Sequence, residues 1–518
     1  MRGKQVSRVK IGAWLSILTG LTLLVATLTA KATGESSLVF DPGICTPGTL
    51  MAGTRPFKYR ACLNIVYVSK PVHVAPPLDS PLLTTYHIMN FYYPEAYDRG
   101  ESINGYTART APIFFRMTVG GYSQAPPATI STASVQQALL RGYVVASPGA
   151  RGIQTKGADG RYYVGKAPAC IADMKAAVCY LRSNDKIMPG DANKIISSGS
   201  SASGALSSLL GATGNNEDYE PYLKELGAAD ERDDVFGASC YCPIMNLENA
   251  DKAYEWQFNG STQFEPNRDG TIPPPLTQTE KGWSNDLKAL LPAYLNSLKL
   301  IAYEPRNDKG VGHESFPGQI KKGTLLTVGA DGNGTFTDYV ASFVMASAQK
   351  ALDAGANLSS FNYLTLSPDG KAVTGIDFWK YSDIRMKRPP AFDTLSLTSP
   401  TPEVQLFGTA AINAQHFTQY GFGQTPVHSL ADQALVKMLN PTYYISAKKT
   451  TIAQYWRIRH GTIDRHTSLA IPVILATMLE NNGYGVDFAL PWNIGHSGEY
   501  DLPELFAWID MIANPSRR

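Results

Sequence analysis

The sequence lacks an excess of charge of either sign. Its 518 residues include 46 lysine and arginine residues against 44 acidic residues, so no strong electrostatic field attracts the chain to nucleic acid or to a membrane surface. The sequence also lacks internal repeats and low-complexity tracts, which excludes a repeat architecture. We therefore expect a globular protein with an uncharged or weakly charged partner, and no nucleic acid.

Cysteine is scarce, and its spacing does not suit a metal site. The chain has six cysteines, with one C-x-C pair at Cys240 and Cys242 and no second pair at the spacing of zinc ligands. In an oxidising compartment the six could form up to three disulfides, whose pairing the sequence does not determine. Buried free thiols are the alternative, and both remain open at this point.

The N-terminus resembles a targeting segment. Basic residues precede an apolar stretch at 11–30, and Ala30-Lys31-Ala32 offers a cleavage site between small residues. We predict that residues 1–32 are a signal peptide and that the protein is secreted, periplasmic or at the cell surface. The apolar stretch approaches the length of a membrane span, so an uncleaved anchor is the alternative and the only expected contact with a membrane.

Hydrophobic residues make up 44% of the chain, enough for a large core, and their spacing alternates between that of strands and that of helices. Strands are predicted at 63–68, 87–93, 112–119, 142–147, 194–198, 455–459 and 486–490. Helices are predicted at 167–182, 202–210, 466–482 and 502–513. Alternation of this kind predicts a mostly parallel sheet flanked by helices.

Residues 243–440 differ in composition and hydrophobic pattern from the segments on either side. They contain proline clusters at 273–275 and 389–390, glycine-rich turns and scattered helices. The strand and helix pattern resumes after them, so we predict that a core formed by 33–242 and 441–518 carries 243–440 as a large inserted lid domain. A separate second domain is the alternative.

The segment Gly199-Ser200-Ser201-Ala202-Ser203 lies between a predicted strand and a predicted helix. A nucleophile elbow needs this arrangement, because it exposes a serine at the tip of a sharp turn flanked by small residues. The segment matches G-x-S-x-G except that Ser203 replaces the last glycine, and Gly204 follows. Ser201 is the predicted nucleophile, although glycine and serine also crowd together in ordinary turns.

A serine nucleophile needs a base and an acid that orients the base. Asp464 follows the predicted strand at 455–459, and His496 follows the one at 486–490. We predict Asp464 as the acid and His496 as the base, because His460 and His466 do not follow the final strand. The chain order serine, aspartate, histidine is that of the α/β-hydrolases.

Two backbone amides are predicted to stabilise an oxyanion. One belongs to Ala202, directly after the serine, and the other to Gly121, in the Gly120-Gly121 pair after an early strand; a plain turn is the alternative for that pair. Asp173 precedes the serine in the sequence, and we expect it on a helix surface.

Four segments resemble bacterial tannases. They are GSSASGALSSLLGATGN (199–215), YCPIMNLENADKAYEW (241–256), RIRHGTIDRHTSLAIPVILA (457–476) and FALPWNIGHSGEYDLPELFAWID (488–510). The resemblance covers most of the chain after about residue 85. It implies an α/β-hydrolase fold with a large inserted lid, hydrolysis of galloyl esters, a triad at Ser201, Asp464 and His496, and an oxyanion glycine at Gly121.

The resemblance also implies three residues that bind the galloyl hydroxyls. Lys387 matches the family's lysine, and Glu403 matches its glutamate, although extra residues precede Glu403. The third position is an aspartate in the family but His466 here, which places galloyl specificity in doubt and leaves ester cleavage intact. A helix start that points to solvent is the alternative for His466.

The sequence therefore predicts an exported serine carboxylesterase of tannase type that acts through an acyl-enzyme on a small phenolic ester. No metal or cofactor is implied. The first alternative is an esterase for feruloyl or other hydroxycinnamoyl or aryl esters. The second is a hydrolase fold without activity that serves as a binding module, which would have no need for the serine, aspartate and histidine together.

Overall fold

The computed structural model describes residues 36–77, 82–262, 264, 266, 270–303, 320–385, 391–425, 427 and 429–514. The predicted signal peptide and Lys387 lie outside these residues. Within them, no helix is both long and apolar enough to cross a bilayer.

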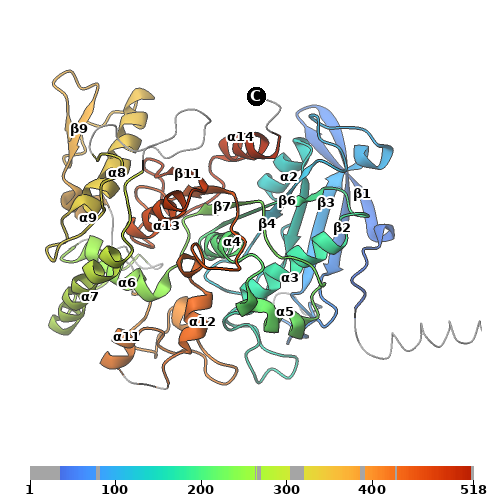
Figure 1. Cartoon of the computed structure of the whole chain (residues 1–518), viewed down its shortest axis with the longest axis horizontal. Helices are drawn as coiled ribbons and strands as arrows, with labels where there is room; N and C mark the ends of the chain where they lie inside the picture. Colours follow the sequence, from blue (N-terminus) through green and yellow to red (C-terminus); the bar gives the residue numbers. More distant parts are fainter. Residues whose placement is uncertain are drawn as a thin grey trace, which may run out of the picture.

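A nine-stranded sheet forms the centre of the described part of the molecule, in the order β1-β2-β3-β5-β4-β6-β7-β10-β11 (Figure 1). Its strands are β1 (Cys45–Ala52), β2 (Arg55–Val66), β3 (Ile88–Pro94), β4 (Pro112–Arg116), β5 (Val144–Pro148), β6 (Asp191–Ser200), β7 (Gly237–Tyr241), β10 (Tyr455–Arg459) and β11 (Gly485–Ala489). From β5 to β11 the neighbours are parallel, whereas β1, β2 and β3 pair antiparallel. The predicted mostly parallel sheet is confirmed.

Helices flank the sheet and extend from one of its ends. They are α2 (Ala133–Leu140), α3 (Ala169–Ser183), α4 (Ala202–Ala212), α5 (Glu220–Leu226), α6 (Leu247–Phe258), α7 (Gln278–Ser297), α8 (Thr335–Asp353), α9 (Phe378–Arg385), α10 (Pro402–Leu406), α11 (Gln419–Gln424), α12 (Gln433–Met438), α13 (Ala470–Asn481) and α14 (Leu502–Ala513). A separate hairpin joins β8 (Leu364–Leu366) to β9 (Val373–Ile376). Four 3-10 turns complete the described elements, at Pro42–Ile44, Glu95–Arg99, Glu217–Tyr219 and Pro441–Tyr443.

Two consecutive residues of β7 show that helices cover both faces of the sheet. A Cβ atom on Gly237 would lie 3.3 Å from side-chain atoms of Trp508 and Ile512 in α14. Ala238, which points to the opposite face because side chains alternate along a strand, lies against Gly211 of α4. β7 is thus enclosed between α4 and α14, which explains its small residues.

The sequence prediction missed β7 and β1. β7 reads GASCY and is buried throughout, so it carries neither an apolar run nor an alternating pattern. β1 is an edge strand whose residues are mostly exposed or partly exposed, and it contains Pro47 and Gly48, which are tolerated at an edge. Neither strand had a hydrophobic signal, because one has small side chains and the other contacts the core weakly.

The chain leaves the sheet after β7 and returns at β10, although these two strands are direct neighbours. Their parallel pairing begins with Gly237 opposite Tyr455. The segment between them includes α7, α8 and α9, which gather at the end of the molecule opposite β1 and β2 (Figure 1). An excursion between adjacent parallel strands leaves the sheet continuous, so both flanking segments contribute to one core.

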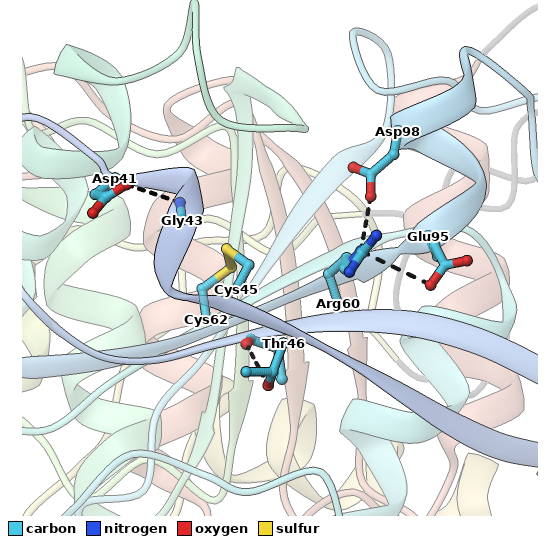
Figure 2. The surroundings of a disulfide bond; sticks show 9 residues. Asp41, Gly43, Cys45, Thr46, Arg60, Cys62, Glu95 and Asp98 are labelled. Carbon is cyan, nitrogen blue, oxygen red and sulfur yellow. Dashed lines mark hydrogen bonds and ion pairs between the residues drawn. A yellow bond between two sulfur atoms is a disulfide. The ribbon is translucent and has the colours of Figure 1, made fainter.

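One disulfide joins Cys45 to Cys62 across β1 and β2 (Figure 2). Near it, Arg60 Nε donates to a carboxylate oxygen of Asp98 at 2.8 Å. The remaining cysteines are free and buried: Cys170, Cys179, Cys240 and Cys242. The chain therefore combines the two alternatives that its sequence left open.

Asp173 is not on a helix surface, so that expectation was wrong. Its side chain is fully buried in α3, where its carboxylate lies 2.7 Å from Arg151 Nη2 and 2.9 Å from His87 Nε2. The Arg151 amide donates a further bond of 2.8 Å. Burial opposes ionisation, but Arg151 and His87 outweigh it and hold the pKa of Asp173 well below its usual range.

We predict that Asp173→Asn lowers the free energy of unfolding by about 3–5 kcal/mol, because it leaves the buried guanidinium of Arg151 without a counter-charge. Denaturant-induced unfolding measures the loss. Asp98→Asn is the matched control, since it removes the closer of two acidic partners of the partly exposed Arg60 and is expected to change stability little. Equal losses in the two variants would contradict the assigned role of Asp173.

Candidate active site

Ser201 lies at a sharp turn between β6 and α4. Its backbone has φ 59° and ψ −122°, a left-handed φ that is strained for a residue with a side chain. Its amide donates to the carbonyl of Tyr241 at 3.0 Å, and its carbonyl accepts from the amide of Ala205 at 3.0 Å. These bonds hold the turn at the carboxyl end of β6, as a nucleophile elbow requires.

Small residues around Ser201 allow close backbone approaches. A Cβ atom on Gly199 would lie 2.4 Å from Cβ of Ser203, and one on Gly204 would lie 2.3 Å from the carbonyl oxygen of Tyr241. Ser203 occupies the usual glycine position, and its hydroxyl donates to the carbonyl of Val119 at 2.8 Å. The departure from G-x-S-x-G is therefore accommodated, because Gly204 provides the close contact and Ser203 binds the neighbouring loop.

That loop contains Gly121. The Ser203 amide also donates to the carbonyl of Val119, at 3.1 Å, which fixes the loop against the first turn of α4. Gly121 has φ 52°, a conformation that favours glycine. The amide of Ala202 is in the first turn of α4, where no carbonyl of the helix can accept from it. The loop and the helix start therefore bring the segments of Gly121 and Ala202 together.

Asp464 and His496 form a direct hydrogen bond. His496 Nδ1 lies 2.8 Å from Asp464 Oδ2, and the amide of His466 donates to Asp464 Oδ1 at 2.9 Å. Although burial opposes ionisation, the neighbouring His460 and His496 lower the pKa of Asp464 to about 2. Asp464 is thus an ionised carboxylate that fixes the orientation of the His496 ring.

The charge of Asp464 acts in return on His496. Burial lowers the pKa of His496, but the hydrogen bond that His496 donates to Asp464 and the proximity of Cys242 more than offset this, so the pKa lies above its usual value. A Cβ atom on Gly498 would lie 2.5 Å from Cβ of Ser200. The loop that carries His496 therefore lies against the turn that carries Ser201.

Cys242 is a site residue that the sequence reasoning missed. Its Sγ donates to the carbonyl of Ser497 at 3.3 Å, and it lies within 4.8 Å of ligand atoms of both Asp464 and His496. These three side chains are the only group in the described part of the chain with metal-ligand spacing. Cys242 directly follows β7. Because the sequence analysis did not predict this strand, it did not place Cys242 at the sheet edge.

His466 lies in the site as well. Its ring stacks on that of His496, with centroids 4.1 Å apart and planes 9° from parallel. His466 is nevertheless an exposed residue, so it forms an outer wall of the site. The alternative that His466 starts the helix is wrong, because α13 begins only at Ala470, whereas the exposure of His466 agrees with the solvent-facing position that this alternative predicted.

Glu403 approaches from the segment between β7 and β10. It is buried near the start of α10. A Cβ atom on Gly121 would lie 3.7 Å from the side chain of the adjacent Pro402. Burial, with a smaller contribution from the charge of Asp251, raises the pKa of Glu403 to about 7. The carboxylate of Asp251 accepts from the amides of Phe392 and Asp393 at 2.8 and 2.9 Å. That contact anchors the segment that follows Lys387 in the sequence.

A strained serine after one parallel strand and an aspartate–histidine pair after two others are typical of the α/β-hydrolases. The chain has this fold, and the family model described as BD-FAE matches its residues 119–251. None of the curated proteins matches the chain.

Solved structures identify the family. A tannin acyl hydrolase from Lactobacillus plantarum is 43% identical over 92% of this chain and 99% of its own, with a TM-score of 0.81. A tannase from Fusobacterium nucleatum is 43% identical over 92% of this chain and 100% of its own, with a TM-score of 0.80. A tannin acyl hydrolase in complex with ethyl gallate is 42% identical over 92% of this chain and 99% of its own, with a TM-score of 0.81. The chain belongs to the tannase family, and it is a carboxylic ester hydrolase.

We predict that Asp464→Asn lowers the pKa of His496 by about 1–3 pH units, because it removes a negative charge in contact with the imidazolium form. Histidine-selective NMR titration measures this without a substrate. The exposed Asp159→Asn is the control and is expected to leave the titration unchanged. An unaltered His496 titration in Asp464→Asn would show that Asp464 does not set the pKa of His496.

Proposed function

We propose that the protein hydrolyses galloyl and related phenolic esters through Ser201, His496 and Asp464. The observation that carries this proposal is the 2.8 Å hydrogen bond between His496 and the buried Asp464, at the sheet edge where Ser201 occupies its strained turn. A chain that only bound ligands would have no need for this combination.

In the proposed mechanism Ser201 Oγ attacks the ester carbonyl carbon while His496 accepts the hydroxyl proton. Asp464 keeps Nδ1 protonated, so that Nε2 serves as the base. The amides of Gly121 and Ala202 stabilise the tetrahedral oxyanion. Collapse returns the proton from His496 to the leaving alcohol, and a water molecule then releases the phenolic acid from Ser201 by the same steps. No metal or cofactor takes part.

The acyl group is proposed to lie between the Gly121 loop and the segment inserted between β7 and β10. Residues 243–440 would then act as a lid that contributes specificity. The position of Glu403 beside the Gly121 loop supports this arrangement, and Lys387 is the proposed second contact to the ring hydroxyls. A phenolic hydroxyl can hydrogen-bond to Glu403 in either of its protonation states.

The phenolic class of substrate is supported by the relatives. Tannin acyl hydrolase structures similar to this chain were solved in complex with ethyl gallate and with 3,4-dihydroxybenzoate. Feruloyl or other hydroxycinnamoyl esters are the second candidate, and His466 favours them. A neutral imidazole offers one acceptor and one donor, whereas the aspartate expected there could accept from two adjacent hydroxyls.

Export is a further part of the proposal. Residues 1–32 are proposed as a signal peptide, retained as an anchor if uncleaved. The Cys45–Cys62 disulfide supports this localisation, because such bonds persist in oxidising compartments.

We predict that Ser201→Ala lowers kcat/KM on methyl gallate by about 10⁵- to 10⁶-fold, because the covalent route is lost. In the wild type a fluorophosphonate probe should label Ser201. Ser208→Ala, a serine within α4 that donates to the carbonyl of Ala205, is the matched control and should be labelled at Ser201 like the wild type. Labelling mapped to Ser200 or Ser203 would contradict the assignment.

We predict that His466→Asp raises kcat/KM on galloyl esters relative to feruloyl esters by about 10- to 100-fold, because a hydrogen bond to a charged acceptor contributes about 1.5–3 kcal/mol. His466→Asn is the matched control, since it removes the ring stacking without adding a charge. Steady-state kinetics on both substrates decide the question. The same ratio in both variants would mean that residue 466 does not contact the acyl ring.

A further inference from the structure

The register of the parallel strands places two further ligand-type side chains beside the site. Tyr241 lies opposite Arg459 in the pairing of β7 with β10, so Cys242 and His460 each directly follow their strand. The Cys242 amide donates to the carbonyl of Arg459 at 2.6 Å, and the His460 amide donates to that of Ala489 at 3.3 Å. Cys242 and His460 are thus adjacent at the sheet edge that also carries Asp464 and His496.

Three of these side chains have the spacing of a metal site. Cys242 Sγ, a carboxylate oxygen of Asp464 and a ring nitrogen of His496 all lie within 4.8 Å of one another. In a tetrahedral zinc site, bond lengths of about 2.3 Å to sulfur and about 2.1 Å to nitrogen separate these two ligand atoms by about 3.6 Å. Small side-chain movements therefore suffice to close the group around one cation.

The buried ring of His460 is an independent indication of a ligand site. Its side chain is fully buried, and neither ring nitrogen has a hydrogen-bond partner among the described residues. Its Nδ1 lies 3.7 Å from Asp464 Oδ2, so the ring is directed at the same carboxylate. Buried polar groups without partners are rare and destabilising, and a cation at this carboxylate would supply a partner.

We propose that Cys242, Asp464 and His496, beside the buried His460, bind one thiophilic divalent cation such as Zn²⁺ or Cd²⁺ and that its binding blocks the esterase. The thiol releases its proton to solvent and binds as the thiolate. Sulfur and imidazole donors favour these cations over Mg²⁺ and Ca²⁺, which prefer oxygen ligands.

Inhibition follows from competition for the same groups. Whichever ring nitrogen of His496 binds the cation, the other nitrogen carries the single proton of the neutral ring, so no lone pair is left to accept the serine proton. His496 is partly exposed, with 18% of its side chain accessible, so a cation can enter from solvent. The block of esterase activity rests on the proposed function, whereas the binding of the cation does not.

The test is a Cd²⁺ titration followed by the ultraviolet thiolate-to-cadmium charge-transfer band, without substrate. We expect one Cd²⁺ per chain in the wild type and in Ser201→Ala. Cys242→Ala and the closer isostere Cys242→Ser should lose the band and bind at least about tenfold more weakly. The matched control is Cys240→Ala, which removes a buried thiol beside Ser207 and should keep the band.

Activity is measured in the same series, each variant relative to its own rate without metal. Zn²⁺ and Cd²⁺ should inhibit the wild type and Cys240→Ala, and they should inhibit Cys242→Ala at least about tenfold more weakly. Mg²⁺ should not inhibit any of these proteins. No band in the wild type, or a band that survives in Cys242→Ala and Cys242→Ser, would overturn the site. Binding without inhibition of an active wild type would overturn the block. Because the charge-transfer band is measured without an ester, it tests the metal site even if the proposed esterase function fails.

Discussion

The candidate site depends on the common register in which four parallel strands end. Ser200, Tyr241, Arg459 and Ala489 are paired in sequence across β6, β7, β10 and β11. The residues that follow them therefore emerge side by side at one edge of the sheet. A shift of one residue in any of these pairings would turn side chains to the opposite face and separate the groups, so the sheet itself sets the geometry of the chemistry.

Two buried carboxylates of this molecule differ in the partners that keep them ionised. Asp173 is held by Arg151, whose charge is permanent at any accessible pH, and it contributes to the stability of the fold. Asp464 is surrounded by histidines, which gain and lose protons near neutral pH. The charge of Asp464 is thus coupled to protons that can move, as the catalytic role proposed for Asp464 requires and a structural ion pair does not.

The sequence predicted most of the core because its strands carry apolar runs. β10 and α14 lie at the predicted residues, and Asp464 and His496 follow their strands as expected. Cys242 was missed because β7 consists of small residues, and the burial of Asp173 was missed because periodicity does not report which ion pairs form. The stacking of His466 on His496 depends on two loops whose meeting no local pattern encodes.

The central claim is that ester cleavage passes through an acyl group on Ser201. The most direct measurement is mass spectrometry of the protein quenched during turnover of an activated ester, para-nitrophenyl gallate, whose rapid acylation makes the intermediate accumulate. The account predicts one galloyl group per chain, in the peptide that contains Ser201 and on that residue. Rapid turnover with no adduct, or an adduct on another residue, would contradict it.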